Sequence, residues 1–176
     1  MRTVLAVLLS TAALLAASEN SGRRAPGFAL PDSKMQILDL ADYRGKIVLL
    51  DFMQTSCAHC GTFADVLERV QQKYGDKVAI LAVVNSAGDN QNTVAQYISG
   101  HRITYPILFD AGQMAYSYLL RMRFDTPHAF LIDAGGTIRN DWDYSLITRD
   151  IFEGNGLMSE IDSLLSGKAA PPKTKK

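Results

Sequence analysis

The sequence predicts an α/β domain with a central mixed β-sheet, flanking helices and an added N-terminal β-hairpin. Two near-continuous apolar runs, 46–52 and 78–84, have the composition of strands that are covered on both faces. The segment between them, 60–74, has apolar residues at helical spacing, so the three predict a right-handed crossover with a parallel strand pair. Further on, 128–142 contains two extended stretches around an Asp-Ala-Gly-Gly turn, which predicts a hairpin.

The remaining elements follow from the same kinds of pattern, taken in chain order. The segment 27–46 alternates short apolar stretches with turn residues and predicts the added hairpin. Glycine and proline mark the limits of the later elements. These are a helix over 93–99, a strand over 105–110, a helix over 114–120 and a terminal helix over 158–165.

Residues 1–18 predict a secretory signal peptide. A positive start containing Arg2 is followed by an apolar run over 4–17 and by a small-residue cleavage site. The run is shorter than the roughly 20 residues that a membrane span needs, so no stable membrane anchor is expected; an uncleaved anchor is the alternative. The protein is therefore expected in the periplasm or another extracytoplasmic compartment.

The rest of the chain has the length of a single domain. Residues 19–25 are expected to form a flexible lead-in, 26–167 the folded domain, and 168–176 a disordered basic tail that contains two prolines. The chain carries 18 Lys and Arg residues against 18 Asp and Glu residues. This balance predicts no surface for binding nucleic acid.

Both cysteines of the chain, Cys57 and Cys60, lie in the stretch "DFMQTSCAHCGTF". A structural bridge is one explanation, but closing so short a loop contributes only about 2 kcal/mol. A structural zinc site would need four ligands, and the three histidines of the chain supply no second close pair, so no metal is predicted. Copper remains an alternative, because Cys57, His59 and Cys60 together suit Cu(I).

A redox centre is the explanation that the local pattern favours. A strand that leads directly into a helix places Cys57 at the first turn and Cys60 one turn on, at a separation that suits a disulfide. Free N–H groups and the helix dipole are expected to lower the pKa of the Cys57 thiol and to make it the nucleophile. Cys60 is then the buried resolving thiol, and no dissociable cofactor is required.

Two further features fit this chemistry. Asp51 interrupts an apolar strand six residues before Cys57, and burial is expected to raise its pKa so that it exchanges a proton with Cys60. The alternative is a strand-end aspartate that meets water. Thr126 and Pro127 precede a predicted strand, where a cis bond would present backbone beside the cysteines for pairing with a substrate chain.

Two histidines are candidates for tuning the redox centre. An imidazolium at His59, between the cysteines, would favour the Cys57 thiolate and raise the reduction potential. The alternative is a ring that points to solvent, away from sulfur. His128, next to Pro127, could line the same site or face outward from its strand.

Three segments together resemble a known family. They are "APGFALPDSKMQILDLADYRGKIVLLDFMQTSCAHC", "YPILFD" and "TPHAFLIDAGGTI". The chain resembles the TlpA/ResA-like branch of the thioredoxin superfamily, exported bacterial thiol–disulfide oxidoreductases with an AhpC/TSA-redoxin-type domain. The resemblance covers about 25–138 and implies a thioredoxin fold for 26–167.

The resemblance also implies roles for individual residues. Cys57 and Cys60 match the redox pair of the family, Pro127 its cis-proline and Asp51 its buried acid. The implied function is disulfide exchange with cysteine-containing protein substrates through a mixed disulfide. A membrane thiol–disulfide transporter is the implied electron donor.

The chain departs from the family pattern at several positions. Ser56 stands where tryptophan is usual, Ala58 and His59 replace a pair with proline, and Phe63 replaces a functional glutamate. These changes bear on the substrate and on the redox direction. A peroxiredoxin is a further alternative, but its chemistry uses a threonine three residues before the cysteine, where this chain has Gln54.

Overall fold

A computed structural model describes residues 20–84, 86–120 and 125–167. The predicted signal peptide, 1–18, and the predicted tail, 168–176, lie outside these residues. In the part of the chain that is described, no helix combines the length and the apolar character needed to cross a membrane.

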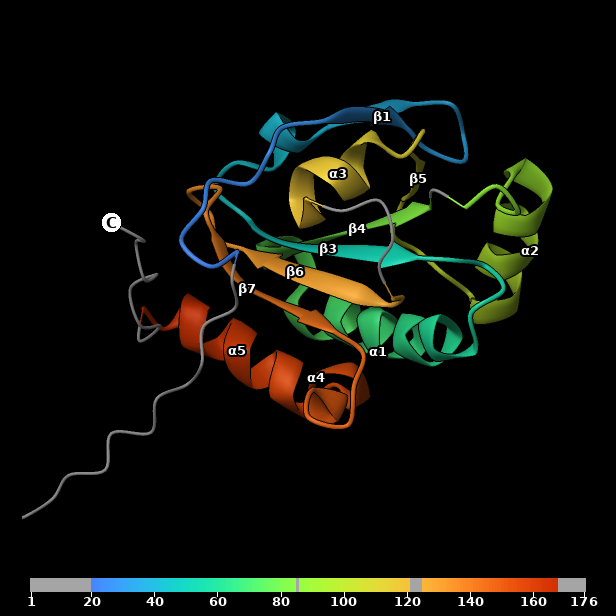
Figure 1. Cartoon of the computed structure of the whole chain (residues 1–176). Helices are drawn as coiled ribbons and strands as arrows, with labels where there is room; N and C mark the ends of the chain where they lie inside the picture. Colours follow the sequence, from blue (N-terminus) through green and yellow to red (C-terminus); the bar gives the residue numbers. More distant parts are fainter. Residues whose placement is uncertain (1–19, 85, 121–124, 168–176) are drawn as a thin grey trace, which may run out of the picture.

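The centre of the molecule is a five-stranded sheet in the order β5-β4-β3-β6-β7 (Figure 1). Its strands are β3 (Ile47–Met53), β4 (Val78–Val84), β5 (Ile107–Phe109), β6 (His128–Ile132) and β7 (Ile138–Asp143). The pairs β3–β4 and β4–β5 are parallel, whereas β3–β6 and β6–β7 are antiparallel. The predicted mixed sheet is therefore confirmed, with the crossover and the hairpin where the sequence placed them.

Helices cover both faces of this sheet (Figure 1). The α-helices are α1 (Ala58–Tyr74), α2 (Gln91–His101), α3 (Gln113–Leu119), α4 (Arg149–Glu153) and α5 (Asn155–Leu165). Helices α1, α4 and α5 lie on one face, and α3 lies on the other together with the small antiparallel sheet of β1 (Ala29–Pro31) and β2 (Ile37–Asp39). The described residues also form two short 3₁₀ helices, η1 (Leu40–Tyr43) and η2 (Gly75–Lys77). The added N-terminal hairpin is thus confirmed, and the short helix α4 is an element that the sequence did not predict.

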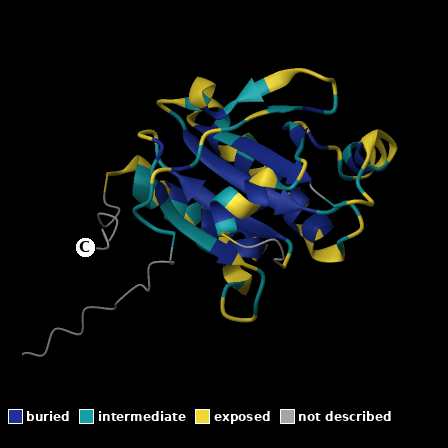
Figure 2. Cartoon of the chain, turned by 45° about the horizontal axis from the view of Figure 1, so that its top comes forward, coloured by how far each residue is buried: buried dark blue, intermediate teal, exposed yellow. Residues whose placement is uncertain are grey.

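Strand β3 divides the core into two clusters. All seven of its residues are buried, and Figure 2 shows the buried residues concentrated along the central strands. Because side chains alternate along a strand, Ile47, Leu49 and Met53 join the cluster under α1. Leu50 and Phe52 join the cluster under α3. Asp51 has the parity of Leu49 and Met53, which puts its carboxyl on the α1 face.

The segment before β1 is held against the β6–β7 hairpin. The amides of Gly22 and Ala25 donate to the carbonyls of Ile138 (2.8 Å) and Gly136 (2.9 Å). The guanidinium of Arg23 donates to two carbonyls at the end of α3, at 2.9 and 2.5 Å. Residues 22, 23 and 25 are therefore in contact with the domain, although the sequence predicted a flexible lead-in over 19–25.

Candidate active site

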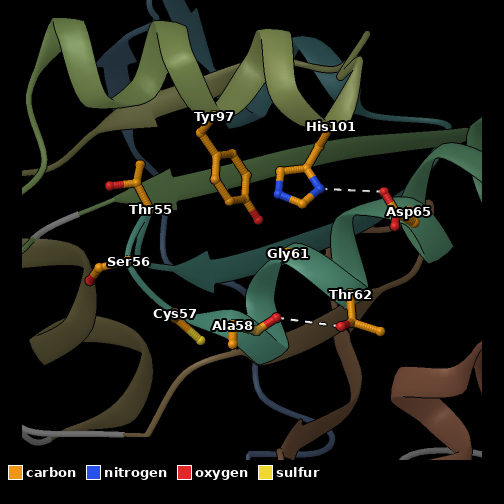
Figure 3. A pocket seen from close by; sticks show the side chains of 9 residues that line it. All are labelled: Thr55, Ser56, Cys57, Ala58, Gly61, Thr62, Asp65, Tyr97 and His101. Carbon is orange, nitrogen blue, oxygen red and sulfur yellow. Dashed lines mark hydrogen bonds and ion pairs between the residues drawn. The ribbon is translucent and has the colours of Figure 1, made fainter.

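The two cysteines lie where β3 gives way to α1. Cys57 is the N-cap residue of α1, with an extended backbone (φ −87°, ψ 115°), and it is partly exposed at the start of the helix (Figure 3). Cys60 is in the first turn and is 1% exposed. The two form a disulfide with a Cα–Cα distance of 5.2 Å. One sulfur is thus accessible to a partner and the other is enclosed by the core.

Backbone groups surround the Cys57 sulfur. The amide of Cys60 donates a hydrogen bond to Cys57 Sγ at 3.1 Å. The carbonyl oxygen of Thr126 lies 3.5 Å from the same sulfur. An amide aimed at sulfur from the first turn of a helix stabilises the negative charge that a thiolate carries.

The loop that carries Cys57 is fixed by a residue from the segment before α2. Asp89 Oδ1 accepts hydrogen bonds from the Thr55 amide (3.0 Å) and from the Thr55 hydroxyl (2.6 Å). The amide of Cys57 in turn donates to the Gln54 carbonyl at 3.1 Å. Asp89 was not predicted, because an aspartate in a Gly-Asp-Asn stretch has the ordinary composition of a loop.

Asp51 lies in β3 and is 2% exposed. The sheet register places it opposite Ala82 in β4 and Ala129 in β6, both fully buried. Burial raises the pKa of Asp51 to about 8. Its Oδ1 has no hydrogen-bond partner among the described residues, so desolvation of the charge is uncompensated. The carboxyl is therefore neutral over most of the physiological pH range.

Two tyrosines share the electrostatic environment of Asp51. Burial, together with the nearby charge of Asp51, raises the pKa of both Tyr97 and Tyr105. The Tyr97 hydroxyl is buried and, like Asp51 Oδ1, has no hydrogen-bond partner in the described part of the chain. Neither tyrosine was predicted as part of the site, because an aromatic residue in an apolar pattern most often belongs to the core.

The backbone before β6 lies next to the disulfide. The Thr126–Pro127 peptide bond is cis. Thr126 contributes the carbonyl beside Cys57 Sγ, and Pro127 is buried. The Pro127 carbonyl accepts a hydrogen bond from the Tyr144 amide at 3.3 Å, which ties this segment to the loop after β7.

The two candidate histidines take different places. His59 is exposed, and its ring stacks on Tyr144 with centroids 4.1 Å apart. His128 is 3% exposed, and its Nε2 lies 3.0 Å from Asp141 Oδ2. His128 stands opposite Phe52 in the register, so its ring lies on the α3 face of the sheet, across from Asp51 and Cys60. The structure therefore does not bring His128 to the sulfurs.

A pocket of about 320 Å³ opens beside Cys57, between α1 and α2 (Figure 3). Its lining residues are Thr55, Ser56, Cys57, Ala58, Gly61, Thr62, Asp65, Tyr97 and His101. His101 Nδ1 lies 3.4 Å from Asp65 Oδ1. A Cβ on Gly61 would stand 2.8 Å from the His101 ring, so glycine allows the imidazole to lie against α1.

The described residues contain no group of three or more His, Cys, Asp or Glu side chains that could hold a metal ion.

Comparison with known proteins connects this geometry to a family. Residues 21–141 match the model of the AhpC/TSA family. Thioredoxin-like protein YneN of Bacillus subtilis is 31% identical over 68% of this chain and 69% of its own length. Thiol-disulfide oxidoreductase ResA of Geobacillus kaustophilus is 34% identical over 67% and 66%.

A solved structure extends the likeness to three dimensions. A Chlorobium tepidum protein described as a DsbE-type thiol:disulfide interchange protein has a TM-score of 0.68 and 26% identity, covering 81% of this chain and 99% of its own. The chain spans about two thirds of the length of the curated relatives above. By fold, by sequence and by the spacing of its cysteine pair, the chain belongs to the AhpC/TSA family and, within it, to the group of ResA-like thiol–disulfide oxidoreductases.

Proposed function

We propose that this protein exchanges disulfides with cysteine-containing protein substrates in an extracytoplasmic compartment, through a mixed disulfide at Cys57. The observation that carries the proposal is the helix start itself. Cys57 is the accessible sulfur and receives the Cys60 amide, while Cys60 is buried within bonding distance of it. A nucleophile and an enclosed resolving thiol are the two parts that such an exchange requires.

In the reducing direction, the Cys57 thiolate attacks one sulfur of the substrate disulfide and releases the other as a thiolate. Cys60 then loses its proton and attacks Cys57 Sγ, which releases the second substrate thiolate. Two electrons pass from the Cys57–Cys60 dithiol to the substrate, and the protein is left in the disulfide form of the structure. The same residues, run in reverse, oxidise a substrate dithiol.

Asp51 is proposed to carry the proton of Cys60. Its pKa of about 8 lets the carboxyl both release and accept a proton near neutral pH, as a general acid–base group must. Asp51 is 2% exposed on the α1 face of the sheet, which separates this proton from bulk solvent.

Thr126 and Pro127 are proposed to hold the substrate backbone. The Thr126 carbonyl lies beside Cys57 Sγ, just before the start of β6, where an extended substrate chain would continue the pairing of the sheet.

The apolar N-terminal run supports export, and a membrane thiol–disulfide transporter is the proposed electron donor. Cys57 and Cys60 form a disulfide, which supports disulfide exchange over copper binding, because copper binding needs both sulfurs as thiolates.

A trapping experiment in the native host tests the proposal. Cys60→Ser should accumulate disulfide-linked partner proteins in the exported fraction, because the mixed disulfide at Cys57 is no longer resolved. Cys57→Ser should accumulate none, and the double variant gives the background. Equal capture by the two single variants would show that the roles are assigned wrongly. Recovery of the untagged chain only in the cytoplasm would contradict the location.

A further inference from the structure

Leu146 and Ile147 are the most exposed large hydrophobic side chains of the described residues, at 90% and 93%. They are adjacent in the loop between β7 and α4, in the sequence "DYSLITRD". The family match ends at residue 141, so family membership assigns this loop no role. Two neighbouring apolar side chains in full contact with water are unfavourable for the free protein and call for a physical explanation.

The loop holds the pair in place with its own hydrogen bonds. The Ser145 amide donates to Thr148 Oγ1 at 3.0 Å, and the two hydroxyls lie 2.9 Å apart. The Thr148 hydroxyl also reaches the Asp143 carbonyl at 2.5 Å, and the Thr148 amide donates to Ser145 Oγ at 3.3 Å. Ser145 and Thr148 therefore close the base of the loop and leave Leu146 and Ile147 at its tip. A tip already fixed in position loses little conformational entropy when it binds a partner.

The base of the loop is continuous with the redox site. Tyr144 donates its amide to the Pro127 carbonyl at 3.3 Å and stacks its ring on His59, which stands between the two cysteines. The Tyr144 ring also contacts Phe152 of α4, with centroids 5.5 Å apart. Figure 1 shows this loop at the end of β7, on the α1 side of the sheet. Tyr144, two residues before Leu146, therefore connects the tip to both segments that flank the disulfide.

The charges around the tip argue for a protein partner rather than a membrane. Binding to an anionic membrane surface uses unpaired basic residues beside the apolar side chains. The basic residue nearest in sequence, Arg149, is paired with Glu153 at 2.6 Å, and Asp143 at the loop base is exposed. Residues 143–153 thus carry one basic side chain against three acidic ones.

We propose that Leu146 and Ile147 form an apolar docking tip that binds hydrophobic side chains close to the reacting cysteine of an extended protein substrate. The proposal rests on the proposed exchange at Cys57 and adds a basis for substrate choice. Unfolded or incompletely folded proteins present such side chains next to their cysteines, whereas small disulfides and most folded surfaces do not. The tip therefore selects non-native protein chains.

A comparison of three disulfide substrates tests the docking tip. The first is a self-quenched, disulfide-linked dimer of a fluorescent peptide with leucines flanking its cysteine. The second is the same dimer with serines at those positions, and the third is hydroxyethyl disulfide. The wild-type reduced protein should prefer the leucine dimer about tenfold in kcat/KM, as expected for burial of one or two aliphatic side chains.

Three double variants carry the test. L146S/I147S should lose the preference for leucine and keep its kcat/KM for hydroxyethyl disulfide within about twofold, since the tip touches neither sulfur. L146V/I147L, which remains apolar, should retain the preference. M35S/I37S is the matched control, because Met35 and Ile37 are also apolar and are 70% and 65% exposed. Ile37 is the first residue of β2 and Met35 lies just before it, in the small sheet that covers the α3 face.

Several results would overturn the docking tip. These are a wild-type protein without preference, a preference that survives in L146S/I147S, an equal loss in M35S/I37S, or an equal fall for all three substrates. A dimer of the wild type that L146S/I147S abolishes, without any change in preference, would assign the tip to a second copy of the chain instead.

Failure of the exchange chemistry would be recognised separately. If the wild type reduces none of the three disulfides, the proposed function is wrong, and binding alone then decides about the tip. Fluorescence anisotropy of the leucine peptide with serine in place of its cysteine measures that binding to the oxidised protein. Weaker binding to L146S/I147S than to the wild type and M35S/I37S supports the tip, and equal binding overturns it.

Discussion

The backbone amide of Cys60 donates a hydrogen bond to the sulfur of Cys57 at 3.1 Å, across the first turn of α1. This relationship gives the two cysteines different chemistry, although only two residues separate them. The sulfur of Cys57 receives a donor and is partly exposed, whereas Cys60 is 1% exposed in the core. The amide stabilises a negative charge on the Cys57 sulfur, whereas the resolving sulfur of Cys60 remains enclosed.

Thiol reactivity should therefore differ strongly between the two cysteines of the reduced protein. Cys57 should be alkylated by iodoacetamide at pH 6.5 at least about tenfold faster than Cys60, because it is accessible and its thiolate is stabilised. Mass spectrometry of time points locates the label. The same protein in denaturant provides the control, where both thiols should react alike. Equal rates in the folded protein would contradict the assignment of Cys57 as nucleophile.

The buried carboxyl of Asp51 should make the stability of the protein depend on pH. Its pKa is about 8 in the folded chain and near 3.8 in the unfolded chain, so the folded state holds one proton more between these values. Stability from this group is complete below about pH 4 and is lost as the pH rises toward 8, by about 1.4 kcal/mol per pH unit. Asp51→Asn cannot ionise and should not show this loss.

The free energy of unfolding of Asp51→Asn minus that of the wild type, both oxidised, should therefore increase steadily from pH 5 to 8. Urea titrations at several pH values measure it, and the increase should level off above about pH 8. Asp76→Asn is the matched control, since Asp76 is exposed and its substitution should give a nearly constant difference. A difference for Asp51→Asn that is flat over this range would show that the carboxyl is solvated.

The sequence was sufficient to predict most of the fold. The apolar runs of β3 and β4 and the helical period of α1 report burial directly. A strand covered on both faces is apolar almost throughout, and a helix covered on one face has apolar residues at helical spacing. Helix α4 was missed because its five residues, Arg149–Glu153, are too few for a period to be recognised. The packing of residues 20–25 was missed because it depends on backbone hydrogen bonds to the β6–β7 hairpin, which leave no pattern in side chains.

The site was predicted less completely, because several of its contacts join segments that are distant in the sequence. Asp51, Cys57 and Cys60 could be placed because all three lie on one continuous strand–helix unit. The sequence does not specify on which face of the sheet the His128 side chain lies. The pairing of His128 with Phe52 decides this and places the ring on the α3 face. Contacts between distant segments, such as Asp89 with Thr55, could not be anticipated, because nothing in either segment specifies the other.

The contact between Asp89 and Thr55 should matter for both stability and exchange. Asp89→Ala removes the acceptor of two hydrogen bonds and should destabilise the protein by about 1–3 kcal/mol. It should also slow attack by Cys57, since the loop is no longer held. Asp89→Asn retains an oxygen acceptor and should lie between Asp89→Ala and the wild type. Denaturant titration and stopped-flow reduction of hydroxyethyl disulfide measure the two effects. An unchanged rate in a destabilised Asp89→Ala would limit Asp89 to a structural role.

His59 should have only a small influence on the reduction potential. Its ring is exposed and stacks on Tyr144, so its charge is screened by solvent, and exposed charge pairs contribute about 1 kcal/mol or less. Because about 1.4 kcal/mol corresponds to 30 mV for this couple, His59→Ala should lower the potential by at most about 20 mV. Equilibration with glutathione buffers measures the shift, with Tyr144→Leu as a control that keeps the imidazole and removes the stack. A fall well above 20 mV would mean that His59 contacts the sulfur in the reduced protein.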